Sequence, residues 1–209
     1  MAGKRVLMVE GSDDEHVVKH LCGVRQLGLI DKIYDCKGKD PLLNAIAVHL
    51  KETDIVALGI LLDADTDLHA RWQAVAQRLQ GAGYSRLPAT PATDGTVIDA
   101  AADTLLPRVG VWLMPDNRVP GILEDFLRFL VPASDPLFAH VEQSVDSISA
   151  GLCRFDTLKK PKAKIHTWLA WQEEPGKPLG QAITARYLDP NLPAADLFAQ
   201  WLQRTFFAP

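Results

Sequence analysis

The sequence predicts an α/β fold with a mainly parallel sheet flanked by helices, followed by a helical C-terminal extension. Three observations support this prediction. Strand-like and helix-like segments alternate through residues 1–131. Residues 55–62 form a continuous apolar run, as expected of a strand covered on both faces of a parallel sheet. From residue 132 onward, the apolar residues recur mostly at helical spacing.

Each element has its own local signal. Apolar runs predict strands at residues 4–10, 32–36, 54–65, 95–100 and 108–116. Apolar residues at helical spacing predict intervening helices at residues 13–27, 40–52, 67–83 and 121–131. Two further helices are predicted at residues 135–149 and 192–206. We therefore expect a core of residues 1–131 and a mostly helical extension, 132–209, that packs on the core.

The composition excludes some classes of protein. The apolar run at 55–62 is too short to span a bilayer, which needs about 20 residues, so no membrane partner is expected. Cys22, Cys36 and Cys153 form no CxxC pair, which indicates a reducing cytoplasm and speaks against a cysteine-rich zinc site.

The net charge of −4 at first argues against a nucleic-acid partner. Eight of the 26 acidic residues, however, lie in or near one predicted metal site; without them, 22 basic residues face 18 acidic ones. The eight are Glu10, Asp13, Asp14, Asp63, Asp65, Asp67, Glu124 and Asp125. If metal cations neutralise these acidic residues, the rest of the protein is mildly basic, and this charge distribution is compatible with binding a polyanion.

The first acidic cluster follows the first strand, in the segment VEGSDDE. Ser12 and Glu15 have the spacing of a capping box, which predicts a helix start. Glu10 has no such explanation. It stands at the carboxyl end of an apolar strand, where ligands gather in open parallel sheets, and a carboxylate there needs a cation or hydrogen-bond donors.

The second cluster is the segment LLDADTD. Asp63 and Asp65 are two residues apart at the end of a buried strand, so an extended backbone would turn both to one side. Two neighbouring carboxylates repel unless a positive charge separates them, and Mg²⁺ suits such oxygen ligands. Asp67 is either a third ligand or the N-cap of the next helix; we favour the cap. In the third cluster, Glu124 and Asp125 occupy a first helical turn, where the helix dipole alone can explain them.

A strand that ends in Glu-Gly, then a helix, then a later strand that ends in Asp-x-Asp resembles the Toprim domain, a Rossmann-like fold of topoisomerases, primases and nucleases. The segment VEGSDD is most similar to OLD-family nucleases and small stand-alone Toprim proteins. The segments PDN, LEDFL and KIHTWLAW extend the similarity to a family of uncharacterised bacterial Toprim-related proteins.

The resemblance implies a set of roles. Glu10 would be the Toprim glutamate, acting as a metal ligand or general acid/base, and Asp63 and Asp65 would hold Mg²⁺ or Mn²⁺. Asp14 matches the acidic position after the glycine, and Glu124, with Asp125 behind it, matches a later acidic residue that helps bind a second metal. Lys164 resembles a basic residue near the scissile phosphate, a position for which Lys159, Lys160 and Lys162 are equally available. Two metals would position the attacking water and stabilise the leaving oxygen.

Several features depart from the larger Toprim enzymes. The chain is too short for the additional domains of topoisomerases and primases, and it has no GxxxxGK[ST] P-loop for the ATPase of OLD nucleases. A nuclease remains by elimination, with an ATPase or another protein as a possible partner in trans.

Two other kinds of site fit the sequence less well. His16 and His20 are one helical turn apart, but they lack the HExxH glutamate of zinc enzymes, so solvent-facing histidines are favoured. The segment DADTD also resembles the motif of haloacid-dehalogenase phosphatases, but its Thr66 is out of register and Glu10 would have no role.

The basic segment 154–164 can track a phosphate backbone through Arg154, Lys159, Lys160 and Lys162, or form a solvated surface loop. Trp168 and Trp171 can stack on bases, although aromatic residues at helical spacing are more often core.

Two function classes follow. The first is a Mg²⁺-dependent nuclease or related phosphotransfer enzyme, which requires Glu10, Asp63 and Asp65 to converge within about 4–6 Å. The second is a non-catalytic Toprim-fold module that binds nucleic acid, a nucleotide or a protein. Fold alone does not choose between them.

Overall fold

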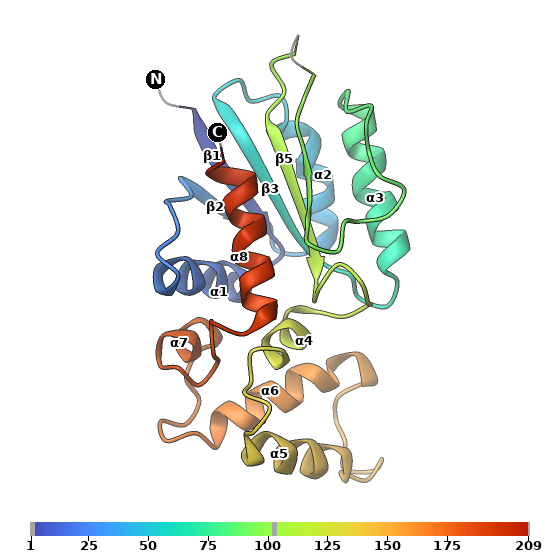
Figure 1. Cartoon of the computed structure of the whole chain (residues 1–209). Helices are drawn as coiled ribbons and strands as arrows, with labels where there is room; N and C mark the ends of the chain where they lie inside the picture. The colour runs from blue at the N-terminus through green and yellow to red at the C-terminus, as the bar shows by residue number, and fades with distance from the viewer. Residues whose placement is uncertain (1–2, 102–103, 209) are drawn as a thin grey trace.

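A five-stranded sheet forms the centre of the computed structural model, which describes residues 3–101 and 104–208 (Figure 1). The strand order is β2-β1-β3-β5-β4. β1, β2, β3 and β5 run parallel, and β4 is antiparallel to β5. The strands are β1 Lys4–Val9, β2 Lys32–Asp35, β3 Ile55–Asp63, β4 Thr96–Ile98 and β5 Arg108–Met114. The predicted α/β class with a mainly parallel sheet flanked by helices is confirmed.

Helices cover both faces of the sheet and make three layers (Figure 1). On one face lie α1, Ser12–Val24, and the C-terminal α8, Pro193–Phe206. On the other lie α2, Lys39–His49, and α3, Leu68–Gly81. Alternate residues of each strand enter the two separate cores: Leu7 packs with α1 and α8, whereas Val6 packs with α2 and α3. This alternation explains why the central strands are apolar at nearly every position.

The close approach of α8 to the sheet depends on glycine. A Cβ atom placed on Gly110 of β5 would lie 2.1 Å from Thr205 Oγ1, and one on Gly59 of β3 would lie 2.5 Å from the ring of Phe206. Thr205 and Phe206 are both buried. The C-terminal helix is therefore seated directly against the two central strands, and it belongs to the same packed body as the core.

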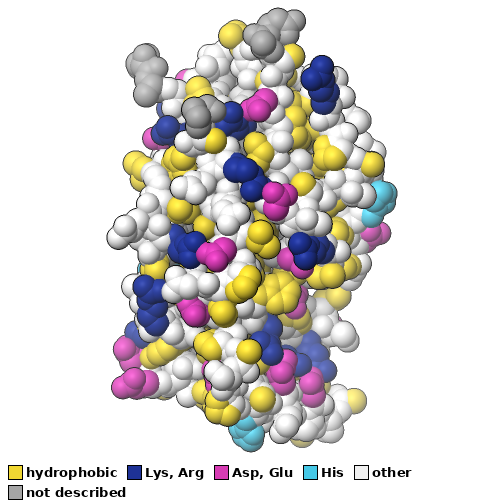
Figure 2. All heavy atoms as spheres, viewed as in Figure 1, with side chains coloured by type: hydrophobic (Ala, Val, Ile, Leu, Met, Phe, Trp, Pro, Cys, Tyr) yellow, Lys and Arg dark blue, Asp and Glu magenta, His cyan; other side chains and the backbone are white. Residues whose placement is uncertain are grey.

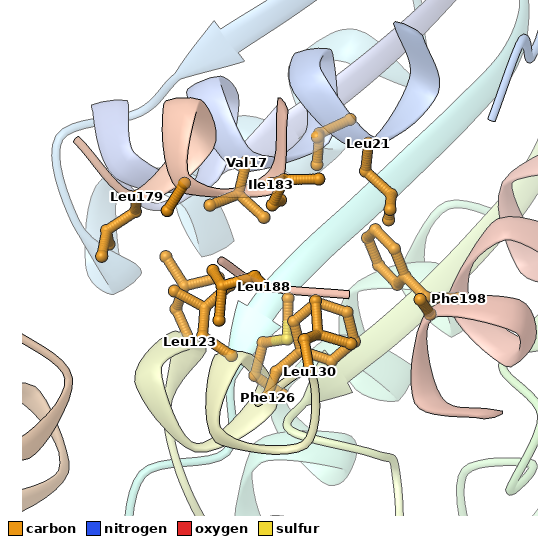
Figure 3. Packing of buried hydrophobic residues seen from close by; sticks show 14 of the residues in the cluster. Val17, Leu21, Leu123, Phe126, Leu130, Leu179, Ile183, Leu188 and Phe198 are labelled. Carbon is orange, nitrogen blue, oxygen red and sulfur yellow. The ribbon is translucent and has the colours of Figure 1, made fainter. Parts of the chain in front are cut away.

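The remaining helices lie beyond the carboxyl ends of the strands (Figure 1). They are α4 Leu123–Arg128, α5 Pro136–Asp146, a 3₁₀ turn η1 at Thr157–Lys159, α6 Lys160–Ala170 and α7 Leu179–Thr184. α4 is held in place by Leu123, Phe126 and Leu130, which meet Val17 of α1 and Ile183 of α7 in one apolar cluster (Figure 3). The chain thus places a layer of short helices directly over the sheet edge where Glu10 and Asp63 emerge.

Two details of the extension differ from expectation. Residues Lys160 to Lys164 belong to α6, so the interpretation of 154–164 as a continuous surface loop is wrong from Lys160 onward. Pro161 near the start of this helix is compatible with a first turn. Trp168 is buried, as expected of a core residue, while Trp171 is 44% exposed.

Among the described residues, no helix has the length and apolar character needed to cross a membrane.

Candidate functional site

The carboxyl ends of β1 and β3 place Glu10 and Asp63 side by side. The backbone N–H of Asp63 donates to Glu10 Oε1 at 2.9 Å, across 53 residues of sequence. Asp63 Oδ1 in turn accepts from the N–H of Leu123 at 2.9 Å, which ties the start of α4 to the end of β3. Parallel strands end at one edge of the sheet, so two acidic residues that each follow a strand meet here as the sequence predicts.

Asp14 joins this edge from the first turn of α1, and it is buried. Its Oδ2 accepts from the N–H of Gly11 at 3.0 Å. The predicted Ser12–Glu15 capping box is wrong, because the helix begins at Ser12 and Gly11 is the N-cap residue. Asp14 takes the capping position, whereas Glu15 pairs with Lys19 at 2.6 Å one turn later.

Glu124 is buried at the same edge, and its counter-charge comes from the helical extension. Lys162 Nζ lies 3.2 Å from Glu124 Oε1 and 3.8 Å from Asp13 Oδ2. Lys162 thereby links α6 to both α4 and α1. Lys162 therefore reaches the acidic edge, whereas Lys164 Nζ lies 3.1 Å from Asp146 on α5.

Burial, together with neighbouring negative charge, raises the pKa of three carboxylates at this edge: Asp63, Asp14 and Glu10. Burial, reinforced by the charges of Asp14, Glu10, Glu124 and Asp65, raises the pKa of Asp63 to about 9. Burial and the neighbouring charges of Glu10 and Glu124 raise the pKa of Asp14 to about 7, against the hydrogen bond from Gly11. Burial also raises the pKa of Glu10. Asp63 and Asp14 therefore keep their protons to a higher pH than usual, and a bound cation would stabilise their ionised forms.

Asp65 and Asp67 are placed differently from Asp63. β3 ends at Asp63, and Asp65 has a left-handed φ of 53°, so the alternation of an extended strand does not apply to this pair. Asp65 Oδ2 meets Arg71 Nη2 at 2.5 Å and Lys39 Nζ at 3.4 Å. Asp67 accepts a backbone hydrogen bond of 2.9 Å in the first turn of α3, which confirms the N-cap interpretation.

Arg71 is a site residue that sequence reasoning missed. It is buried, and its Nε donates to the Asp63 carbonyl at 2.8 Å while its Nη2 contacts Asp65. The guanidinium therefore fixes the backbone turn that carries both aspartates. A clue was available in the sequence: an arginine stands one turn into the helix that follows the Asp-x-Asp segment, within reach of the preceding loop.

The other predicted residues are spread over several surfaces. Asp125 Oδ2 accepts from the N–H of Ile122 at 2.9 Å as the cap of α4, and burial raises its pKa. Lys160 Nζ lies 2.7 Å from Asp146, Lys159 Nζ lies 3.8 Å from Asp156, and Arg154 is exposed. The helical period of α6 separates Lys162 from the face shared by Lys160 and Lys164.

The donor set fits a hard divalent cation. Glu10, Asp14 and Asp63 each use one oxygen to accept a backbone hydrogen bond, an arrangement that orients the carboxylate. Carboxylate oxygens are the ligands that Mg²⁺ prefers. Within residues 3–101 and 104–208, no group of three or more acidic, histidine or cysteine side chains has converged into a ready-made metal geometry. Binding would therefore require the carboxylates to rotate toward a shared ion.

Comparison with known proteins gives one match. No curated protein and no solved structure matches the chain significantly. A family model described as a protein of unknown function, DUF3226, matches residues 4–207, which include all five strands and the whole acidic edge. Since the match spans nearly the entire sequence, this chain is a member of the DUF3226 family.

Proposed function

We propose that the acidic edge is a Toprim-like metal site and that the protein is a Mg²⁺-dependent nuclease or related phosphotransfer enzyme acting on nucleic acid. One observation carries the proposal: Glu10, Asp14, Asp63 and Glu124, from four separate elements, interact electrostatically at the carboxyl edge of a parallel sheet. Burial, reinforced by repulsion from these acidic neighbours, raises the pKa of Asp63 to about 9. Strongly perturbed carboxylates at such an edge are typical of functional sites.

The chain's own residues have distinct roles in this proposal. Glu10, Asp14 and Asp63 are the candidate ligands, and Glu10 is also the candidate general base. Mg²⁺ (or Mn²⁺), when bound, supplies charge stabilisation and lowers the pKa of a coordinated water. Arg71 holds the Asp63 turn in position through the Asp63 carbonyl.

Lys162 is the cation best placed to meet a phosphate at this edge. Its ammonium pairs with Glu124 and Asp13. Burial opposes the charged form of Lys162, but the charge of Glu124 and the hydrogen bond to it outweigh burial and raise the pKa of Lys162. The side chain therefore stays protonated near neutral pH. A protonated lysine beside a scissile phosphate neutralises charge that develops in the transition state.

A non-catalytic Toprim-fold module is the second candidate, and a specific observation favours it. Several of the acidic side chains already have partners within the protein: Asp65 pairs with Arg71, Glu124 with Lys162, and Asp125 caps α4. A site of this kind can persist as a structural network while the surface binds nucleic acid, a nucleotide or a protein such as an ATPase in trans.

Calorimetric titration with Mg²⁺ and Mn²⁺ separates the two candidates. The test variant is Asp63→Asn, in which the amide oxygen can still accept from the N–H of Leu123. The matched control is Asp67→Asn, the same chemical change at a residue that caps α3, where asparagine caps equally well. Binding by the wild type and Asp67→Asn, with loss in Asp63→Asn, supports a metal site.

Nuclease assays on single- and double-stranded DNA and RNA then test catalysis with the same three proteins. Cleavage that needs the divalent ion and disappears in Asp63→Asn supports the enzyme. Metal binding without cleavage of any substrate would favour the module. No metal binding in the wild type, even with an oligonucleotide present, would refute the metal site.

A further inference from the structure

A cleft of about 260 Å³ lies between α4, α5 and α6, next to the acidic edge. Glu124 and Asp125 line one side of it. Glu124 is also the carboxylate that Lys162 contacts, so the cleft and the proposed metal site share a wall. At this end of the molecule, formed by α5 and α6, basic and acidic side chains stand side by side on the surface (Figure 2).

Three basic side chains also line the cleft, Arg128 of α4 and Lys160 and Lys164 of α6, together with Glu142 of α5 and neutral residues. These three cations share two acidic partners, Glu142 and Asp146. Lys160 and Lys164 lie 2.7 and 3.1 Å from Asp146. Glu142 is farther from its partners, at 3.6 Å from Arg128 and 3.9 Å from Lys164. Charge-assisted hydrogen bonds are normally about 2.7–2.9 Å long, so Arg128 and Lys164 hold Glu142 only loosely.

The guanidinium of Arg128 is held in place by an aromatic ring. Its central carbon lies 4.2 Å from the centroid of Phe138, which is buried on α5 and also lines the cleft. This contact orders the side chain without using its N–H groups, because a ring face attracts a cation electrostatically. An ordered guanidinium with spare donors matches the two oxygens of a phosphate.

The size of the cleft limits its occupant. At about 260 Å³ it lies below the range of about 300–1,000 Å³ that is usual for small-molecule pockets. It can hold a phosphate with part of one attached sugar. Surface ion pairs of the kind that line it contribute little, about 0–1 kcal/mol each, so a phosphate can displace them.

We propose that this cleft is a phosphate-binding subsite for a single nucleotide unit, with Arg128, Lys160 and Lys164 as its cations. The inference rests on the proposed function. In that function, the scissile phosphate of a nucleic-acid strand lies at the acidic edge, and the cleft holds the next phosphate of the same strand. Its contacts do not involve Glu10 or Asp63, so it is tested separately.

The test is calorimetric titration of the full-length protein with adenosine monophosphate and with inorganic phosphate, in EDTA. The variants are Arg128→Gln and Lys160→Gln. The control is Lys51→Gln, the same loss of charge at an exposed residue between α2 and β3, at the opposite edge of the sheet. We expect each cleft variant to bind adenosine monophosphate about tenfold more weakly, the loss expected for one charge-assisted hydrogen bond. Lys51→Gln should bind like the wild type.

Two results would overturn the inference: neither ligand binds the wild type, or both cleft variants bind as the wild type does. Amide NMR shifts of the wild type provide a check that needs no variant, since they should change in α4 and α6. Mg²⁺ titration of the wild type distinguishes the two proposals. If the wild type fails to bind Mg²⁺ while the nucleotide still maps to the cleft, the metal site falls and the subsite stands. If the wild type binds Mg²⁺ but not the nucleotide, the subsite falls and the metal site stands.

Discussion

Replacing Asp63 with asparagine should flatten the pH dependence of stability. The pKa of Asp63 is raised from 3.8 to about 9, first by burial and then by its acidic neighbours. Between these values the folded protein holds a proton on Asp63 that the unfolded chain has released. The stability that this proton contributes is complete below pH 3.8 and is lost progressively as the pH rises toward 9. Asparagine has no proton to release, so this loss is absent from the variant.

The magnitude follows from the number of protons involved. One proton held only by the folded state changes the free energy of unfolding by about 1.4 kcal/mol per pH unit. From pH 6 to pH 8, the wild type should therefore lose about 3 kcal/mol more than Asp63→Asn. Asp14 contributes a similar slope below its pKa of about 7. That contribution is present in both proteins and cancels in the comparison.

Urea denaturation in EDTA at pH 6, 7 and 8 measures the effect, with Asp67→Asn as the control at a carboxylate that caps α3. The wild type and Asp67→Asn should lose stability in parallel, while Asp63→Asn should change less. Equal slopes for all three proteins would mean that Asp63 is ionised throughout this range. The electrostatic argument for a cation site at the sheet edge would then fail.

Three further outcomes test how the site and the fold are held together. Lys162→Met should lower the free energy of unfolding by about 1 kcal/mol, because buried Glu124 loses a half-exposed cation; thermal denaturation measures this. Gly110→Ala should cost about 3 kcal/mol in urea unfolding, because the added methyl group would lie 2.1 Å from Thr205 Oγ1 and displace α8. Asp67→Ala should cost about 1 kcal/mol by the same assay, through loss of the α3 N-cap.

Matched variants show whether each loss has the stated cause. Gly23→Ala adds the same methyl group where nothing lies within 4 Å, and it should not destabilise. Asp67→Asn should retain the cap that Asp67→Ala removes. Lys51→Met removes an exposed charge at the opposite sheet edge. A cost for these controls equal to that of the test variants would refute the specific contacts named above.

Much of the fold was predictable because burial imposes local patterns. The strand at 55–63 is apolar at successive positions since both faces are covered, and the helix at 68–81 has its buried residues at helical spacing. The antiparallel direction of β4 was not predictable. The direction of a strand depends on the path by which the chain reaches its neighbour β5, and the three residues of β4 carry no signal of that path. α7 has only six residues, too few for a helical period to be evident.

The candidate site divides in the same way. Glu10 and Asp63 each follow an apolar strand, so the sequence alone determined that their carboxylates stand at one edge of a parallel sheet. That Asp67 caps a helix was also evident from its position. These properties depend on residues close together in the chain, where the periods of strand and helix decide which side is buried.

Only the tertiary structure decided which cations meet those carboxylates. The basic segment offers several lysines at similar spacing, and the docking of α6 against α4 and α1 brings Lys162 to Glu124 while Lys160 and Lys164 turn toward Asp146. The backbone turn at Asp65, with its positive φ, likewise directs that carboxylate to Arg71. The lysine pairings join residues of different helices, and they form only when packing has fixed the orientation of each helix.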